Sequence, residues 1–376
     1  MNFRLFISPN SSKFIFLLVT SILLSGCSDS TPIKIGFLGG LSGRVADLGI
    51  GGRNGAALAV EMRNASGGID GRQLQLISED DQQNVNVAKA ALNRLIQQKV
   101  EAVIGPMTSS IAVAVTPQAN AAEMLLISPT ATSTALSIKN DYFMRVISST
   151  SAYAQKSAEF HYRKQGVRRT AVIYDLSNHA YTESWLNDYR KAFENAGGQL
   201  EMVIGFESSD KTRFAEIVEP VLSSDVESLL ILANSVDTAL IAHQIRKHNQ
   251  KLQINTSEWA ATERLLELGG QWVEGVVFAQ FIDRESTSQR YIDFRDLYLE
   301  RFGQEPGFAG LTGFDAANVL IDALNLRQTD QSIAEFIMQQ RTFTAAQSVL
   351  KFDDNGDANR KTYLTTIKNG KFQHIN

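Results

Sequence analysis

The sequence predicts an α/β protein built on two parallel sheets, and three observations lead to that prediction. Short apolar segments alternate with segments of helical periodicity along most of the chain, a pattern typical of strands joined by crossover helices. The alternation restarts after residue 147, and 376 residues exceed what one hydrophobic core usually organises. A single continuous sheet is disfavoured because open sheets rarely exceed about ten strands.

The first cycle of strands and helices ends near residue 148. About four strands are expected before that point, and a further apolar segment at 143–147 closes the cycle. Helices are expected between the strands because apolar residues recur there at a spacing of three or four. The strands are placed at 33–38, 73–78, 101–105 and 124–128, and the helices at 55–63, 85–98 and 111–122.

The second cycle is predicted to contain five strands between residues 170 and 280. The strands are placed at 170–174, 200–206, 228–233, 252–255 and 276–281, and the helices near 183–195, 213–222 and 238–248. The remaining C-terminal third is different, with helices near 290–302, 316–326 and 333–340. Its β-rich end carries Asn-Gly hairpin signals at 355–356 and 369–370. Since no Pro-rich linker occurs, we expect short crossing strands to join the two lobes as a hinge.

Composition and charge exclude several classes of protein. Hydrophobic residues make up 44% of the chain and charged residues 20%, which excludes a disordered or collagen-like protein. A net charge of −4 gives no electrostatic reason to expect nucleic-acid binding. The single cysteine, Cys27, excludes an internal disulfide framework and a Cys-rich metal site.

Residues 1–26 read as a secretory signal. Basic Arg4 and Lys13 precede an uncharged, mostly apolar run at 14–24, which is too short for a membrane-spanning helix of about 20 residues. Leu-Ser-Gly-Cys at 24–27 resembles a bacterial lipobox, which implies cleavage before Cys27 and lipidation of its sulfur. The alternative is an ordinary signal with an incidental cysteine. The lipidated mature chain would keep 350 residues of the 376, and several acyl chains make a stable anchor.

No catalytic or metal-binding constellation is visible. The five histidines lack ligand spacing with acidic partners, and we interpret them as solvated surface residues. Residues 49–55 (GIGGRNG) fail the dinucleotide pattern because Asn54 stands at the third glycine position, so these glycines indicate a close approach to a helix start. Residues 353–357 (DDNGD) suggest a calcium loop, but a hairpin turn explains them without a metal. Adjacent Asp80 and Asp81 would point to opposite faces of a strand. We therefore expect no enzyme, no cofactor and no metal.

Seven ordered segments resemble the leucine/isoleucine/valine-binding family, type I periplasmic solute-binding proteins of ABC transporters. They are IKIGFLGGLSGRVADLG (33–49), NGAALAVEMRNASGGIDGRQLQLISEDD (54–81), AVIGPMTSS (102–110), LLISPTATS (125–133), TAVIYDLSNHAYTESW (170–185), VEGVVF (273–278) and FDDNGDANRKTYLTTIKNGKF (352–372). The resemblance implies two Rossmann-like lobes joined by a three-crossover hinge, with the ligand in the cleft. It implies that 31–147 plus 281–345 form lobe one and 148–280 plus 346–376 form lobe two.

The resemblance also implies a site for a zwitterion. Family positions matching Ser109, Thr130 and Thr132 hold the ligand carboxylate, and Ser110 accompanies Ser109 at a helix start, where free N–H groups favour an anion. The alternative for Ser109 is a simple helix N-cap. Glu258 matches the family acid that binds the ammonium group; the alternative is a solvated loop glutamate.

Further contacts are implied in lobe two. Tyr181 stands where the family tyrosine closes over the ligand, although its loop departs from the family pattern. Asn234 and Ser235 follow the next strand, where the family places another contact. Leu48 replaces a common aromatic residue, and Trp259 is either a platform for the ligand side chain or simple packing.

We therefore expect an extracytoplasmic substrate-binding lipoprotein that captures an amino acid or similar small zwitterion. Its partners would be an ABC permease and the membrane that holds the lipid anchor, with no nucleic acid, and we expect a monomer. Ser28 after the lipidated cysteine favours the outer membrane over the inner one. The alternative is a receptor of the same fold that senses its ligand for signalling.

Overall fold

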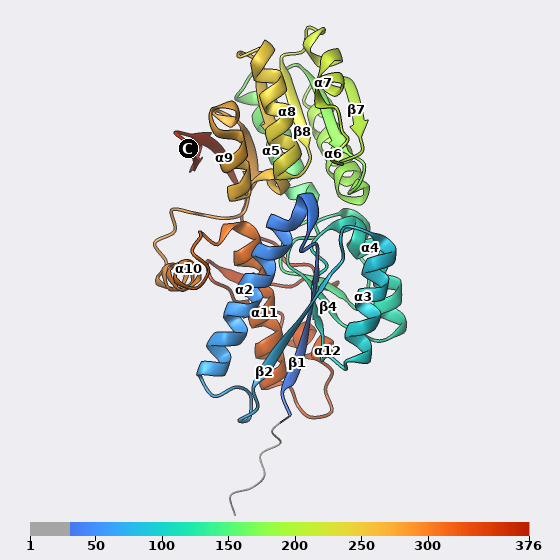
Figure 1. The fold of residues 1–376 in the computed structure, drawn as a ribbon, viewed down its shortest axis with the longest axis vertical. Helices are drawn as coiled ribbons and strands as arrows, with labels where there is room; N and C mark the ends of the chain where they lie inside the picture. Colours follow the sequence, from blue (N-terminus) through green and yellow to red (C-terminus); the bar gives the residue numbers. More distant parts are fainter. Residues whose placement is uncertain (1–30, 376) are drawn as a thin grey trace, which may run out of the picture.

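The computed structural model describes residues 31–375. They form two lobes, each a sheet with helices on both faces, which confirms the predicted α/β class (Figure 1). The first sheet is parallel throughout, and the second is parallel except for two antiparallel strands at its C-terminal edge. The signal segment and Cys27 lie outside the described residues, so the structure leaves these predictions as they stand.

The first lobe contains five parallel strands in the order β2-β1-β3-β4-β5, where about four were expected. The additional strand is the segment at 143–147, which pairs with β4. The strands are β1 (Ile33–Gly39), β2 (Leu74–Asp80), β3 (Val103–Ile104), β4 (Leu126–Ser128) and β5 (Phe143–Arg145), and the helices between them are α2 (Ala46–Ala65), α3 (Val85–Gln97) and α4 (Ser109–Ala121).

Alternation along these strands explains the layers. In β1, Ile35 and Phe37 belong to the core beneath α2, whereas Leu38 belongs to the core beneath α3 and α4. Successive side chains of a strand point to opposite faces, so the continuous apolar run is buried on both sides. The carboxyl ends of β1, β3 and β4 consequently meet at the edge of the sheet that faces the second lobe (Figure 1).

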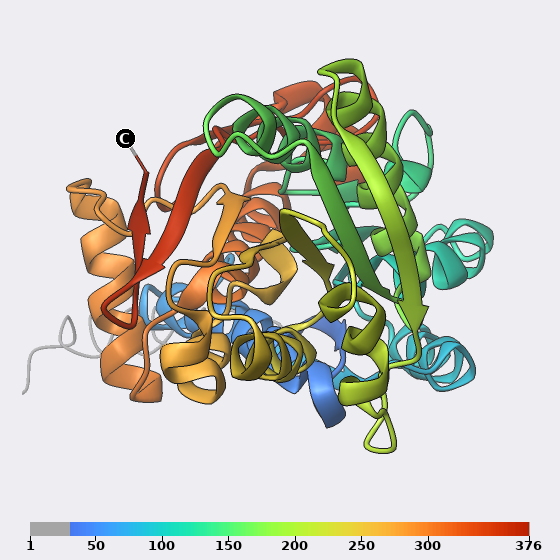
Figure 2. The same ribbon diagram turned by 90° about the horizontal axis from the view of Figure 1, so that it is seen from above.

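The second lobe contains a seven-stranded sheet in the order β14-β13-β10-β9-β8-β6-β7. The C-terminal strands occupy one edge and β7 the other, as the view from above shows (Figure 2). The strands β6 to β10 are those predicted, at Arg169–Asp175, Gln199–Phe206, Ser228–Leu232, Gln253–Thr256 and Val277–Gln280; their helices are α5 (Thr150–Arg163), α6 (His179–Asn195), α7 (Phe214–Leu222), α8 (Ser235–His248) and α9 (Glu263–Gly269).

The C-terminal third completes both lobes. The helices α10 (Gln289–Phe302), α11 (Gly307–Leu326) and α12 (Ile333–Gln340) belong with the first lobe, and the strands β13 (Tyr363–Lys368) and β14 (Lys371–His374) extend the second sheet. The Asn369-Gly370 signal is the β13–β14 hairpin turn. The Asn355-Gly356 signal is a short hairpin turn closed by the antiparallel bridge between Phe352 and Ala358, in which Asp353 Oδ1 accepts the N–H groups of Asn355 and Asp357. An unpredicted hairpin joins β11 (Thr342–Thr344) to β12 (Val349–Lys351).

The chain passes between the lobes three times, from β5 to α5, from β10 to α10 and from β12 to β13. Two buried ion pairs lie at these passages. Arg145 contacts Asp357 at 2.6 Å, and Arg360 contacts Asp315 at 2.6 Å. The third passage is therefore fixed to the first passage and to α11.

The glycines at 49–55 have a different role from the one expected. Helix α2 begins at Ala46, so these glycines lie inside it and do not precede it. A Cβ on Gly55 would lie 2.0 Å from the carbonyl oxygen of Gly310, and one on Gly313 would lie 2.1 Å from that of Gly52. Helices α2 and α11, which run side by side in Figure 1, approach this closely because both lack side chains at the contact.

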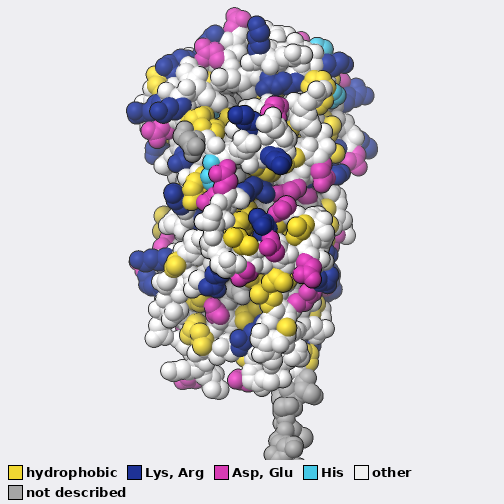
Figure 3. Space-filling model, turned by 90° about the vertical axis from the view of Figure 1, so that its left-hand side faces the viewer, with side chains coloured by type: hydrophobic (Ala, Val, Ile, Leu, Met, Phe, Trp, Pro, Cys, Tyr) yellow, Lys and Arg dark blue, Asp and Glu magenta, His cyan; other side chains and the backbone are white. Residues whose placement is uncertain are grey.

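The face of the molecule shown in Figure 3 carries no large patch of one charge, because Lys and Arg side chains are interspersed there with Asp and Glu. Within residues 31–375, no helix has the length and apolar character needed to cross a membrane.

Candidate ligand-binding site

Both lobes line a small cavity at the carboxyl ends of the strands. Its wall contains polar groups from both lobes and a set of apolar side chains. The lining residues are Leu48, Met107, Thr108, Ser109, Thr130, Thr132, Ile147 and Phe308 from the first lobe, and Asn178, Tyr181, Glu258 and Trp259 from the second. Small-molecule sites usually have this mixture of apolar surface and a few polar groups.

The first lobe offers hydroxyl groups at the start of a helix. Ser109 is the first residue of α4, and its Oγ accepts the N–H groups of Thr132 and Ser133 at 3.1 Å each. The N-cap residue of α4 is Thr108, so the simple N-cap alternative for Ser109 is wrong. Thr132 Oγ1 is buried and has no partner among the described residues. Thr130 donates its hydroxyl to the carbonyl of Met107.

The second lobe offers a buried acid. Glu258 follows β9 in a short 3-10 helix, Glu258–Ala260, and is only 3% exposed, which excludes a solvated loop glutamate. Its Oε2 accepts the indole N–H of Trp185 at 3.1 Å, whereas Oε1 has no partner in residues 31–375. Burial raises the pKa of Glu258 from 4.5 to about 7, and the hydrogen bonds offset only part of that rise.

Aromatic and aliphatic side chains form the rest of the wall. Tyr181 lies in the first turn of α6 and meets Trp259 edge to face, with ring centroids 5.3 Å apart. The Tyr181 hydroxyl is buried without a partner among the described residues. Trp259 lines the cavity, so it is more than interior packing. Leu48, Met107 and Phe308 complete an apolar surface on the first-lobe side.

Three predicted contacts lie outside this cavity. Ser110 bridges the lobes, because its N–H donates to Asn178 Oδ1 at 3.0 Å and its Oγ accepts the Ala180 N–H at 3.1 Å. Asn234 caps α8 and holds Asp237 through its amide. Ser235 donates its hydroxyl to Asp47 at 2.6 Å. All three side chains are engaged within the protein.

A second group of residues joins the lobes beside the cavity. Arg44 contacts Asp237 at 2.6 Å, and Asp47 Oδ2 accepts the hydroxyls of Ser235 and Thr262 at 2.6 Å each. We call Arg44, Asp47, Ser235, Asp237 and Thr262 the outer contact cluster.

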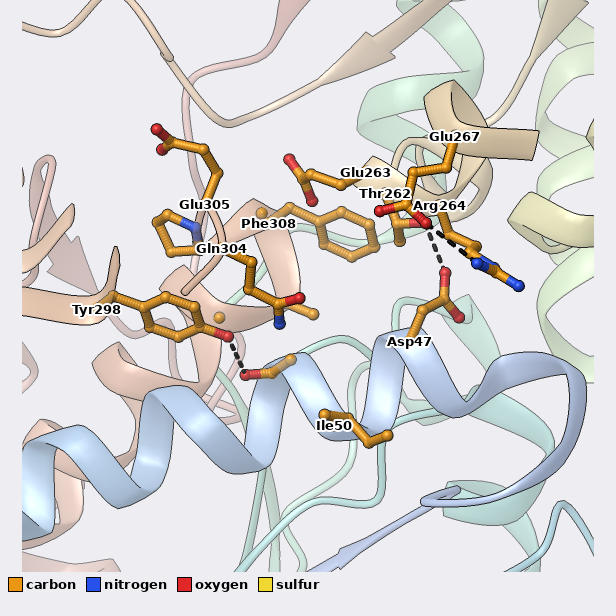
Figure 4. A pocket seen from close by; sticks show the side chains of 15 residues that line it. Asp47, Ile50, Thr262, Glu263, Arg264, Glu267, Tyr298, Gln304, Glu305 and Phe308 are labelled. Carbon is orange, nitrogen blue, oxygen red and sulfur yellow. Dashed lines mark hydrogen bonds and ion pairs between the residues drawn. The ribbon is translucent and has the colours of Figure 1, made fainter. Parts of the chain in front are cut away.

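The outer contact cluster borders a groove of about 750 Å³ between α2, α9 and the start of α11 (Figure 4). Figure 4 shows Asp47 reaching from α2 to Thr262 of the second lobe. Phe308 lines both the groove and the cavity.

Some site residues had no clear signal in the sequence. Ile147 and Phe308 lie in segments that give no indication of which surface they line. Asn178 lies in the loop at 175–184, whose sequence departs from the family pattern. Trp185 does have a signal, because Trp185, Tyr189 and Phe193 recur every four residues and so share one face of α6.

The interpretation of the histidines is wrong for one of them. His161 is fully buried, and its Nδ1 lies 2.9 Å from the hydroxyl of Tyr189. Burial lowers the pKa of His161 to about 3. Within residues 31–375, no three His, Cys, Asp or Glu side chains are grouped to hold a metal.

The two lobes, the three passages between them and the cavity at the strand ends define a bilobed receptor for a small molecule. The chain belongs to the periplasmic binding protein family, which matches residues 32–371. This family consists of solute-binding proteins and not enzymes, and it acts outside the cytoplasm, as the sequence predicted.

Similar proteins confirm the resemblance to the Leu/Ile/Val-binding proteins. A leucine-, isoleucine-, valine-, threonine- and alanine-binding protein of Pseudomonas aeruginosa is 22% identical over 330 residues, covering 86% of this chain and 87% of that protein. The crystal structure of a leucine-binding protein from Thermotoga maritima has 26% identity and a TM-score of 0.84, covering 92% of this chain and 98% of that one.

A branched-chain amino acid transporter substrate-binding protein from Streptococcus pneumoniae, in complex with isoleucine, has 23% identity and a TM-score of 0.85. The match covers 92% of this chain and 99% of that one. This likeness confirms the type I two-lobed fold.

Proposed function

We propose that this chain is the lipid-anchored substrate-binding protein of an ABC transporter and captures an amino acid in the cavity between its lobes. The observation that carries the proposal is the pair of unpartnered polar groups in the cavity. Thr132 Oγ1 beside the start of α4 suits an anion, and Glu258 Oε1 suits a cation. A buried polar group without a partner is costly, and a zwitterion would satisfy both groups.

The roles follow from this geometry. The hydroxyls of Ser109 and Thr132, together with the N-terminus of α4, hold the ligand carboxylate. Glu258 holds the ammonium group, and the Tyr181 hydroxyl adds a contact from the second lobe. The hydroxyl of Thr130 is bonded to Met107, so Thr130 contributes shape and its backbone. Ser110, Asn234 and Ser235 act by joining the lobes or shaping their contact, without touching the ligand.

The apolar wall supports a ligand with an apolar side chain. Leu48, Met107, Ile147, Trp259 and Phe308 offer no charged group to a ligand. The name of the similar protein from T. maritima specifies leucine, and that of the P. aeruginosa protein specifies leucine, isoleucine, valine and alanine together with threonine. An aliphatic amino acid therefore fits best.

Capture would couple to closure. A ligand that contacts both lobes binds the closed form more tightly than the open form and shifts the equilibrium toward it. We propose the lobe limits that the resemblance implies, 31–147 plus 281–345 for lobe one and 148–280 plus 346–376 for lobe two, with one change. Residues 346–351 join lobe one, because β12 pairs with β11 and the chain crosses to the second lobe only after β12. The pairing of β1 to β5 and of β6 to β10 in separate sheets supports this division.

Lipidation of Cys27 would hold the receptor at a membrane, facing the periplasm. Metabolic labelling with palmitate tests the anchor: the full chain should take up label, and Cys27→Ser should not. Membrane fractionation of the labelled protein then separates the outer membrane, which Ser28 favours, from the inner one.

Isothermal titration calorimetry of the chain from residue 28 tests the ligand proposal. The protein is unfolded and refolded to remove any carried ligand, then titrated with each common amino acid. We expect at least one aliphatic amino acid to bind, and benzoate, which has a carboxylate and no amine, to bind more weakly. Absence of binding by every amino acid would refute the proposal. Glu258→Gln is the matched variant, since it keeps the size of the side chain and removes its charge.

A further inference from the structure

Glu258 accepts a hydrogen bond from a residue that does not line the cavity. Trp185 lies on α6, is fully buried, and donates its indole N–H to Glu258 Oε2 at 3.1 Å. The other carboxyl oxygen, Oε1, is left without a partner in the described part of the chain. The hydrogen bond therefore divides the carboxylate into one oxygen bound to the protein and one available to the cavity.

The indole N–H has a specific effect because it can only donate. A donor of this kind stabilises the ionised carboxylate and offers nothing to the proton of the neutral acid. Phenylalanine at this position would keep one aromatic ring in place, and it would lose the donor together with part of the volume of the indole.

A column of rings fixes the indole. Trp185 stacks on Tyr189 with centroids 5.5 Å apart, and Tyr189 stacks on Phe193 at 5.2 Å. At the middle ring of the column, the Tyr189 hydroxyl meets His161 Nδ1 of α5 at 2.9 Å. His161 is neutral at ordinary pH because burial lowers its pKa, so this contact places no charge beside the column. The indole consequently has little freedom to turn away from Glu258.

The other titratable groups near the carboxyl are two tyrosines, Tyr153 of α5 and Tyr181 of α6. Burial raises the pKa of both far above neutrality, so neither ionises where Glu258 does. Arg145 and Arg360 at the hinge lower the pKa of Tyr153 only in part. Glu258 therefore titrates against a constant background.

We propose that Trp185 is the positioning residue for Glu258: its indole N–H fixes one carboxyl oxygen so that the other faces the ligand. The inference rests on the proposed ammonium role of Glu258. It assigns to the α6 aromatic column a function in recognition besides its packing in the core.

A ligand-free experiment tests the contact. The chain has three tryptophans, at 185, 259 and 272, so the indole region of a ¹⁵N NMR spectrum is simple, and Trp185→Phe identifies one signal. We expect the Trp185 signal to move with an apparent pKa of about 7, that of Glu258, and to become fixed in Glu258→Gln. The Trp272 ring packs on His243, with ring centroids 4.8 Å apart, and its signal serves as the internal control that Glu258→Gln should leave unchanged. A Trp185 signal that does not move in the wild type overturns the inference.

Binding of L-leucine to three variants supplies the second test. Trp185→Phe should weaken binding about 10-fold, as expected for loss of a hydrogen bond to a charged group, and should move the midpoint of the affinity–pH profile upward. Tyr189→Phe is the matched control: it removes the bond to His161, lowers the melting temperature, and leaves the pH midpoint unchanged.

The outcomes separate the two proposals. If Glu258→Gln abolishes binding and Trp185→Phe has no effect, the inference fails and the proposed function stands. If Glu258→Gln binds as well as the wild type, the ammonium role fails. If L-leucine does not bind the wild type, the proposal of an aliphatic amino acid as ligand is refuted. The NMR titration then still tests whether Trp185 is hydrogen-bonded to Glu258.

Discussion

The cavity and the outer contact cluster lie between the same two lobes, and their polar groups differ in one respect. In the outer contact cluster, the carboxylates of Asp47 and Asp237 are paired across the lobes with hydroxyls or with Arg44. In the cavity, Thr132 Oγ1, Tyr181 OH and Glu258 Oε1 are buried without partners in the described residues. The carboxylates of the outer contact cluster are satisfied by closure alone, and these three cavity groups are not.

This difference indicates how closure depends on the ligand. Hydrogen bonds in the outer contact cluster form whenever the lobes meet, so they favour the closed form with or without a ligand. Burying the cavity groups opposes closure by about 1–3 kcal/mol for each unsatisfied group. A ligand removes that opposition, which makes the closed form dependent on its arrival.

The largest expected effect comes from the cavity. Glu258→Ala should weaken binding of an amino acid at least about 100-fold, because it leaves the ligand ammonium buried and unpaired, a cost of about 3–5 kcal/mol. We expect only a modest fall in the melting temperature of the ligand-free protein, because the buried indole N–H of Trp185 loses its acceptor while a buried acid is removed. Calorimetry and thermal unfolding measure the two quantities. A loss of less than 10-fold would contradict the assigned role.

The second expected effect is a pH dependence of affinity. With a pKa of about 7 in the ligand-free protein, Glu258 must lose a proton before it can pair with an ammonium group. Protons therefore compete with the ligand below that pH. The dissociation constant should rise about 10-fold for each pH unit below 7, to about 100-fold at pH 5, and should be level above pH 8. Glu258→Gln should give a flat profile over the same range.

A smaller effect is expected from the outer contact cluster. Arg44→Ala should weaken binding about 10-fold although Arg44 does not line the cavity, because Asp237 stays buried without its cation and closure becomes less favourable. The expected change lies mainly in a faster dissociation rate, measured by stopped-flow fluorescence. Glu61→Ala is the control, since it removes an exposed ion pair with Arg301 inside the first lobe. Equal effects of the two substitutions would show that closure is not involved.

The smallest effect is expected at the rim of the same cluster. Asp210 also contacts Arg44, at 3.2 Å, but its side chain is 97% exposed. Exposed ion pairs contribute little, so Asp210→Ala should change affinity less than about 2-fold at physiological salt. A larger change would mean that the cluster acts through its total charge and not through its buried pairs.

Much of the fold follows from the sequence because burial on both faces leaves long apolar runs, such as those of β1 and β8. The limits of α2 were missed because its glycines serve contact with a helix about 250 residues away. That contact has no local signature. His161 was misread for a similar reason, since its burial depends on α6 and its neutral form on desolvation.

The site was predictable where strand ends determine position. Ser109, Thr132 and Glu258 follow strands and line the cavity. Asn234 and Ser235 also follow a strand, yet the turn after β8 directs them to Asp237 and Asp47. A strand end locates the correct edge of the sheet, but the path of the following turn decides whether a side chain reaches the cavity.

The close contact of α2 with α11 has a consequence for the order of folding. Residues 46–65 and 307–326 are the partners, so a growing chain exposes the apolar side of α2 until most of the protein has been synthesised. The second lobe acquires β6 to β10 earlier and lacks only its edge strands. Assembly of the N-terminal lobe should therefore be the late event, and a chaperone that recognises exposed apolar segments would find its substrate there.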